Sequence, residues 1–172
     1  MRDVAIASFA QTKYVRNQNR LTEVDMLVPV IQQAIERSGI PKQEIGFTCH
    51  GSSDYLAGQF FAFVGAVDAL GAWPPVAESH VEMDGAWALY EAWVKIQTGD
   101  VDSALVYGFG KSASGDLAEV LPLRLDPYCV APLWPDPDSV NALQARAWIE
   151  KTGPTQRHLA ALSRIPLRCC SR

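Results

Sequence analysis

One stretch in the middle of the chain limits the possible folds more than any other. A short segment, Val76–Val81, precedes a run of apolar residues at helical spacing across positions 88–96, and Gly99 then marks a helix end. The run Ser103–Tyr107 is short, continuous and apolar, as expected of a buried strand. The pattern predicts strand, helix and strand, with a tight turn of small residues opening the helix. In α/β proteins, ligand-binding and catalytic groups commonly lie at such a turn.

Strands and helices also alternate before this stretch. Thr22 and Asp25 have the spacing of a capping box, which predicts a helix that runs to Ser38 and ends at Gly39. Pro29 would kink this helix if Thr22 is its N-cap, and would be less costly if Asp25 is the effective cap. The other predicted elements are strands at Val4–Phe9 and Ile45–Cys49, a polar turn at residues 50–54, and a helix at Leu56–Leu70.

The helix at Leu56–Leu70 is apolar on nearly every side, as shown by Phe60, Phe61, Phe63 and Val64. A helix of this kind is buried. Since the run is too short for a membrane span, it belongs either inside a larger protein or at a subunit interface. The sequence leaves these two alternatives open.

The predicted order over residues 1–111 is β-α-β-α-β-α-β. This order is typical of an α/β fold with a mainly parallel sheet and helices on both faces. Residues 112–138 carry five prolines and predict a long loop. Residues 139–162 predict helices of the same domain, at Ser139–Lys151 and Gln156–Leu162. Residues 163–172 lack any period and contain Pro166, so we expect an irregular, loosely held tail.

Composition excludes several classes of protein. The chain has 172 residues, a hydrophobic content of 48% and a net charge of −4, which favours a globular domain and argues against a nucleic-acid-binding protein. We expect no membrane span and no secretory signal. The four cysteines and three histidines lack the spacing of a metal site, so we expect no bound metal or cofactor and a reducing, cytoplasmic environment.

Four segments together resemble the N-terminal half of a thiolase, and most closely the lipid-transfer-protein or sterol-carrier branch of that superfamily. They cover about residues 1–162. The segments are the opening VAIASFAQTKY, the segment TCHGSSDYLAG at Thr48–Gly58, the run Gly85-Ala86-Trp87-Ala88-Leu89, which resembles the G-x-x-A-L at the start of the nucleophile helix, and Asn141–Leu162.

The resemblance implies acyl-CoA or steroid-CoA thioesters as substrates and a homodimer. Two departures stand out. A thiolase carries its reactive cysteine three residues before the helix glycine, where this chain has Glu82, and the second thiolase half does not follow. Because a carboxylate cannot form an exchangeable thioester, thiolysis is in doubt. Branch members without the cysteine resemble retro-aldolases of steroid breakdown that work with an OB-fold partner.

The candidate catalytic residues are Glu82 and Asp84, at the start of the third helix. They would exchange a proton or polarise a carbonyl; alternatively, they only cap the helix. His80 is a candidate for substrate binding or is a packed strand residue. Ser52 and Ser53 either line the same pocket or cap the second helix. A rival function is binding of acyl-CoA or of a partner without catalysis, and an inactive fragment is a third.

Overall fold

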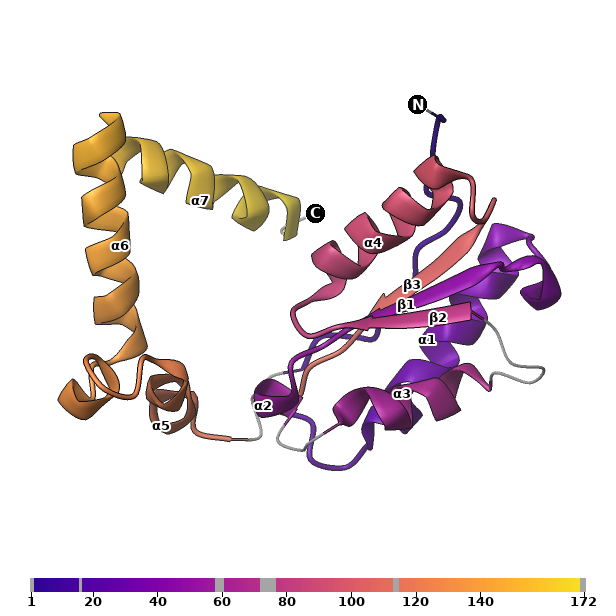
Figure 1. Cartoon of the computed structure of the whole chain (residues 1–172), viewed down its shortest axis with the longest axis horizontal. Helices are drawn as coiled ribbons and strands as arrows, with labels where there is room; N and C mark the ends of the chain where they lie inside the picture. Colours follow the sequence, from indigo (N-terminus) through magenta and orange to yellow (C-terminus); the bar gives the residue numbers. More distant parts are fainter. Residues whose placement is uncertain (1, 16, 58–60, 72–76, 113–114, 171–172) are drawn as a thin grey trace. The chain divides into compact units, whose positions relative to one another are not determined.

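The computed structural model describes residues 2–15, 17–57, 61–71, 77–112 and 115–170. The chain forms two compact units, Met1–Asp116 and Leu117–Arg172. In the described part of the first unit, β1 (Phe47–Gly51), β2 (Ala77–Val81) and β3 (Ala104–Gly108) form a sheet of order β2-β1-β3. Both pairings are parallel, so the predicted α/β class with a parallel sheet is confirmed (Figure 1).

Alternate residues of β1 face opposite sides of the sheet. Phe47 and Cys49 are buried in one apolar cluster with Ala88 and Ala92 of α4 (Gly85–Thr98). The small alanines let the helix approach the strands closely, and Figure 1 shows α4 covering this face. Asp84 is the N-cap of α4, and Gly99, with φ of 81°, ends it in the left-handed conformation that glycine adopts readily.

The other face of the sheet is covered by α1 (Glu23–Ser38) and α3 (Ala62–Leu70) (Figure 1). Helices on both faces are therefore confirmed. The two helices and β3 share one cluster of buried residues, which comprises Leu27, Ile31, Ala66, Ala69, Leu70 and Tyr107.

The capping box at the start of α1 is present. The Asp25 N–H donates to Thr22 Oγ1 at 3.1 Å, and the Thr22 N–H donates to Asp25 Oδ2 at 2.9 Å. Thr22 is thus the N-cap, and Pro29 lies inside the helix, where it lacks the N–H that would bond the Asp25 carbonyl. The helix continues to Ser38 because Leu27 and Ile31, on both sides of the proline, are buried against the core.

The strand predicted at Val4–Phe9 is wrong, since the structure describes this segment as irregular. Two hydrogen bonds to distant positions hold it. Ser8 Oγ donates to the Ala34 carbonyl at 2.7 Å, and Arg37 donates to the Phe9 carbonyl at 2.9 Å. Ile6 and Phe9 are exposed, so the apolar residues that suggested a buried strand have no core to join.

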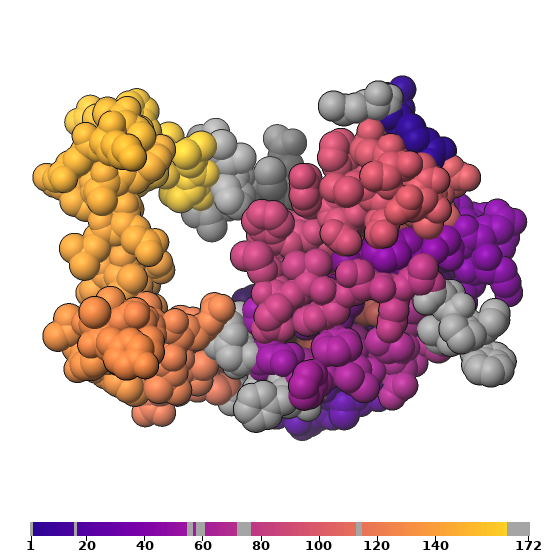
Figure 2. All heavy atoms as spheres, viewed as in Figure 1, coloured from indigo at the N-terminus to yellow at the C-terminus, as the bar shows by residue number. Residues whose placement is uncertain are grey.

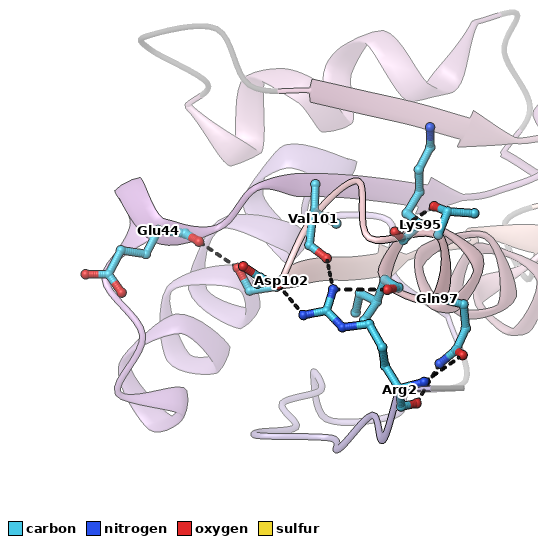
Figure 3. Close-up of polar contacts among 9 residues, drawn as sticks. Arg2, Glu44, Lys95, Gln97, Val101 and Asp102 are labelled. Carbon is cyan, nitrogen blue, oxygen red and sulfur yellow. Dashed lines mark hydrogen bonds and ion pairs between the residues drawn. The ribbon is translucent and has the colours of Figure 1, made fainter.

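Arg2 anchors the start of this segment to the end of α4 (Figure 3). Its guanidinium pairs with Asp102 and donates to the carbonyls of Ile96 and Val101. Its backbone exchanges two hydrogen bonds with the Gln97 side chain, at 3.1 and 2.7 Å. The N-terminal segment is therefore tied down by polar side chains rather than by a strand ladder.

The single helix predicted at Leu56–Leu70 is also wrong. α2 spans only Asp54–Ala57, residues 58–60 lie outside the described part, and α3 begins after Phe61. Phe61 has φ of 55°, a left-handed conformation that is uncommon for a bulky residue. The Asp54 carboxylate holds this break, because it accepts from the N–H groups of Phe61 at 2.8 Å and Ala62 at 3.0 Å. Phe61 and Val64 are exposed in this single chain, so the interface alternative stays a prediction.

We expect Asp54→Ala to destabilise the chain by about 1–2 kcal/mol, because two N–H groups at the start of α3 lose their acceptor. Urea denaturation followed by circular dichroism measures the effect. Asp68→Ala is the matched control, since Asp68 is exposed on the same helix and should change stability by less than about 0.5 kcal/mol. Equal losses in the two variants would show that the cap is unimportant.

β1 and β2 also differ in detail from the predicted strands. β1 lies two residues further along than predicted, so His50 and Gly51 belong to the strand and not to a turn. β2 begins at Ala77, and the predicted first residue, Val76, lies outside the described residues. The shift matters for function because it brings His50 into the sheet.

The second unit is helical in its described residues. The region predicted as a proline-rich loop contains a short α-helix, α5 (Leu117–Val120), and two short 3-10 helices, η3 (Leu121–Arg124) and η4 (Ala131–Leu133). The helix predicted at Ser139–Lys151 is present as α6 (Pro137–Thr152), with Asp136 as its N-cap. The predicted division into domains stays a prediction.

The irregular tail predicted for residues 163–172 is wrong up to residue 170. α7 spans Gln156–Cys170 and passes through Pro166. Proline removes one hydrogen bond from an established helix, which weakens it but does not always end it. No helix in the described ranges is long and apolar enough to cross a membrane.

Candidate functional site

Three of the predicted residues meet where β1 and β2 end. Ser52 Oγ lies 3.3 Å from His80 Nε2, and the same nitrogen lies 3.8 Å from Glu82 Oε2. Parallel strands end at the same edge of a sheet, and this edge is where α/β proteins bind ligands. The geometry follows from the register, in which His50 is paired with His80 and Gly51 with Val81. We call Ser52, His80 and Glu82 the His80 cluster.

The other oxygen of Glu82 is fixed by the backbone. Glu82 Oε1 accepts from the Asp54 N–H at 2.8 Å, which leaves Oε2 facing His80. Ser52 is buried, the His80 side chain is mostly covered, and the Glu82 side chain is about half exposed. The cluster is therefore held in place on one side and accessible on the other.

The chemistry available to this cluster is proton transfer. Ser52 and Glu82 approach the same nitrogen of His80, so the three groups cannot pass a proton in series as a serine–histidine–acid triad does. A neutral His80 can accept a proton from a bound molecule, and the adjacent Glu82 carboxylate would stabilise the imidazolium that results.

The remaining predicted residues hold the backbone. Asp84 Oδ1 accepts from the N–H groups of Ala86 at 2.9 Å and Trp87 at 3.3 Å, so its carboxylate caps α4. Ser53 Oγ donates to the Met83 carbonyl at 3.3 Å. These two residues support the turn on which Glu82 sits.

A row of aromatic rings crosses the sheet beside the His80 cluster. Phe63 of α3 stacks on His80 with a ring centroid distance of 4.6 Å, and His80 lies 5.2 Å from His50 of β1. The His50 ring is in turn nearly parallel to Tyr107 at 5.1 Å and to Phe109 at 5.3 Å. We call these five residues the aromatic row.

His50 is the residue in this region that the sequence prediction missed. Its side chain is 2% exposed, and within the described part of the chain neither ring nitrogen has a hydrogen-bond partner. Burial, followed by the nearby His80, lowers the pKa of His50 to about 4, so the ring is neutral at pH 7. The alternation in Phe47–Gly51, with Thr48 and His50 on one face, was the signal that could have revealed it.

Cys49 lies on the opposite face of β1 from His50, as the alternation of a strand predicts. Its thiol is buried, and this burial raises its pKa to about 11. A nucleophilic cysteine needs a lowered pKa, so a Cys49–His50 catalytic pair is excluded on both geometry and charge.

Two cavities flank the sheet. The smaller, of about 160 Å³, adjoins the aromatic row and is lined by His50, Phe63, Val67, Glu78, Ser79, His80 and Tyr107. The larger, of about 420 Å³, lies against α4 and is lined by Phe47, Ala77, Glu78, Ser79, Glu91, Lys95, Asp100 and Val101. None of the predicted site residues lines the larger cavity, so the smaller one is the chemically relevant space.

Two comparisons with known proteins assign the chain to no family. A scan against models of protein families finds no match, and a search of curated proteins finds none either. In the described ranges, no group of three or more His, Cys, Asp or Glu side chains is arranged to hold a metal ion. The His80 cluster and the aromatic row are the features of the structure that bear on function.

Proposed function

We propose that this chain is part of a cytoplasmic, thiolase-like protein of the lipid-transfer branch that acts on acyl-CoA thioesters. The reaction we propose is retro-aldol cleavage of a β-hydroxyacyl-CoA, such as a steroid side chain. The observation that carries the proposal is the position of Glu82. It follows β2 directly and faces His80. By the sequence resemblance, Glu82 takes the position of the thiolase cysteine.

In this reaction His80 Nε2 accepts the proton of the β-hydroxyl group. The bond between the α- and β-carbons then breaks, the β-carbon becomes a carbonyl, and the electron pair forms the enolate of the shortened thioester. His80 returns the proton to the α-carbon, so no oxidant or metal is consumed. Glu82 Oε2, 3.8 Å from His80 Nε2, stabilises the imidazolium between the two proton transfers.

The surface supports a larger assembly. α4 presents a row of exposed apolar side chains, in which the Tyr90 and Trp93 rings stack at 5.9 Å. Figure 2 shows α4 at the surface of the first unit. The exposed residues of this face are Trp87, Leu89, Tyr90 and Trp93. Such a face marks a protein interface. We propose that it is covered by a second thiolase half, by a second copy of this chain in a homodimer, or by an OB-fold partner.

The test is cleavage of a β-hydroxyacyl-CoA that carries a tertiary alcohol. Mass spectrometry would follow the ketone and the shortened acyl-CoA together, and we expect them in equal amounts. His80→Gln and Glu82→Gln should each lower the cleavage rate, His80→Gln by about 10²–10⁴-fold because it removes the general base. Glu36→Gln is the matched control, because Glu36 is exposed on α1, far along the chain from the site.

Two outcomes would reject the reaction. One is cleavage that His80→Gln leaves unchanged. The other is a covalent acetyl group within residues 76–90 after incubation with acetoacetyl-CoA, which would show that the chain follows the thiolase reaction. We expect no such label, because Glu82 cannot form an exchangeable thioester.

Binding of acyl-CoA without catalysis is the second candidate function. One observation favours it: the carboxylates of Asp84 and Glu82 both accept backbone N–H groups and so have an architectural role. Isothermal titration distinguishes the two functions. Acyl-CoA binding that releases heat but yields no ketone would support binding alone. The result should hold when the partner that covers the exposed face of α4 is added.

A further inference from the structure

The last helix of the chain, α7, differs in charge from the rest of the chain (Figure 1). Residues 151–172 contain five lysine or arginine side chains and no aspartate or glutamate, although the whole chain has a net charge of −4. The nearest carboxylate along the chain, Glu150, is already paired with Arg146 at 2.6 Å. The positive charge of this segment is therefore not neutralised by any acid near it in the sequence.

The charge lies along one side of the helix. Arg157 and Arg164 are seven residues apart, about two turns, so they lie on the same side, and both are exposed. Leu159 and Leu162 fall on the opposite side by the same spacing, and Leu162 is 60% exposed. In the sequence, Arg168 follows Arg164 at the spacing of one further turn. α7 is thus an amphipathic helix with a basic side and an apolar side.

Hydrogen bonds within the chain fix where α7 starts. Gly153, with φ of 85°, ends α6. His158 then reaches back to the beginning of the next helix, where its Nδ1 accepts from the Thr155 N–H at 2.9 Å. The basic side and the apolar side are therefore set by bonds inside the chain. Binding through them costs less conformational entropy than folding a disordered segment would.

We propose that α7 binds membrane surfaces that carry anionic phospholipids, with Leu162 entering the headgroup region and the arginines pairing with lipid phosphates. A helix with a basic side, an apolar side and modest overall hydrophobicity lies in the plane of the membrane interface. Arginine side chains are long enough to reach back to the phosphates, which they bind with two parallel hydrogen bonds. The cytoplasmic leaflet carries such lipids. The His80 cluster plays no part in this binding.

The apolar side of α7 favours a membrane over two other partners. A nucleic acid would use only the arginines and would leave the exposed Leu162 in water. A groove on another protein would take large anchor residues, most often aromatic, and α7 contains no phenylalanine, tyrosine or tryptophan. A lipid surface needs only apolar area beside positive charge, and α7 offers both.

The test is sedimentation of the full chain with lipid vesicles. We expect binding to vesicles of phosphatidylcholine with about one quarter phosphatidylserine, and none to phosphatidylcholine alone. Arg157→Gln combined with Arg164→Gln should weaken binding about 25-fold, which is about fivefold for each charge lost. Lys13→Gln combined with Arg20→Gln is the matched control. It removes the same charge from exposed positions of the first unit and should change the affinity by less than about twofold.

A second variant tests the apolar side. Leu162→Ser should weaken vesicle binding at least about fivefold, because the buried apolar contact is lost. Ile6→Ser is its control, since Ile6 is also exposed but belongs to the first unit. Raising the salt concentration should release the unmodified chain from the vesicles, which tests the role of charge even if a variant fails to fold.

Three results would overturn the proposal. The first is equal sedimentation with both kinds of vesicle, or none with either. The second is an equal loss of affinity in the arginine pair and in its control pair. The third is tight binding to mixed-sequence RNA that Leu162→Ser leaves unchanged, without binding to anionic vesicles, which would assign the basic side to nucleic acid. None of these results bears on the proposed cleavage reaction, because that assay contains no vesicles.

Discussion

Gly51→Ala is expected to lower the free energy of unfolding by about 3 kcal/mol or more, which is a large part of the total stability of a small domain. A Cβ atom at this position would lie 2.2 Å from the carbonyl oxygen of Asp84, 2.4 Å from its carbonyl carbon and 2.9 Å from the nitrogen of Gly85. All three are backbone atoms at the start of α4, so no side-chain rotation relieves the overlap. The end of β1 and the start of α4 would have to separate.

Urea denaturation followed by circular dichroism measures this effect, and Gly110→Ala is its control. A Cβ at Gly110 meets no heavy atom within 4 Å, and the residue does not have a positive φ. This variant should therefore match the original chain or gain up to about 1 kcal/mol, because alanine restricts the unfolded chain. If the two variants unfold at the same urea concentration, the end of β1 does not contact the start of α4 closely in the folded chain.

Acidification from pH 7 to pH 4 is expected to cost on the order of 3 kcal/mol of stability through His50 alone. The folded-state pKa of His50 is about 4, below the ordinary value of 6.5. Between pH 6.5 and pH 4, His50 binds a proton in the unfolded chain but stays neutral in the folded chain. Stability is thus complete above about pH 6.5 and is lost as the pH falls toward 4.

The groups around His50 explain this direction. Burial is the largest cause, and the neighbouring His80 adds repulsion, whereas Asp54 partly offsets both. Glu78 and Tyr107 line the same cavity as His50. His50→Phe removes the titration and leaves the other acidic and basic groups in place, so its stability should fall less between pH 7 and pH 4. Parallel stability curves for the two proteins, or a His50 pKa near 6.5 by NMR, would contradict the prediction.

Local sequence signals predicted the parts of the fold that depend on neighbouring residues. Thr22 caps α1, and Gly99 ends α4, as their positions indicated. The parallel sheet followed from the alternation of strands and helices. In contrast, the segment Val4–Phe9 is held by Arg37 and by the Ala34 carbonyl, which lie far along the chain, and no local pattern reports such contacts.

Other errors have equally specific causes. Hydrophobic periodicity predicted one helix through Phe61, but this residue adopts a left-handed conformation that the Asp54 carboxylate stabilises through its hydrogen bonds. At Pro166 the general rule that proline ends a helix gave the wrong answer. The first error depends on the contact with Asp54, and the second depends on the helix around Pro166. Neither can be read from the residue alone.

The candidate site was predicted in part. Ser52 and Glu82 directly follow β1 and β2, and His80 lies in β2, so the shared edge of the two parallel strands brings the three side chains together. The role of these residues as a site stays a prediction. Asp84 caps α4 in the structure, the simpler of the two roles considered. His50 was missed because the strand was placed two residues too early, which assigned this residue to a turn.

The position of β1 at the centre of the sheet has a consequence for biosynthesis. Phe47 pairs with Ala77 on one side and with Ala104 on the other, so both partners of β1 leave the ribosome after it does. Closing such distant pairings is slow compared with helix formation, and synthesis adds only about 5–20 residues each second. A nascent chain that stops before β2 therefore carries a complete α1 and an unpaired central strand. During this interval the strand is open to a chaperone or to a neighbouring nascent chain on the same messenger RNA.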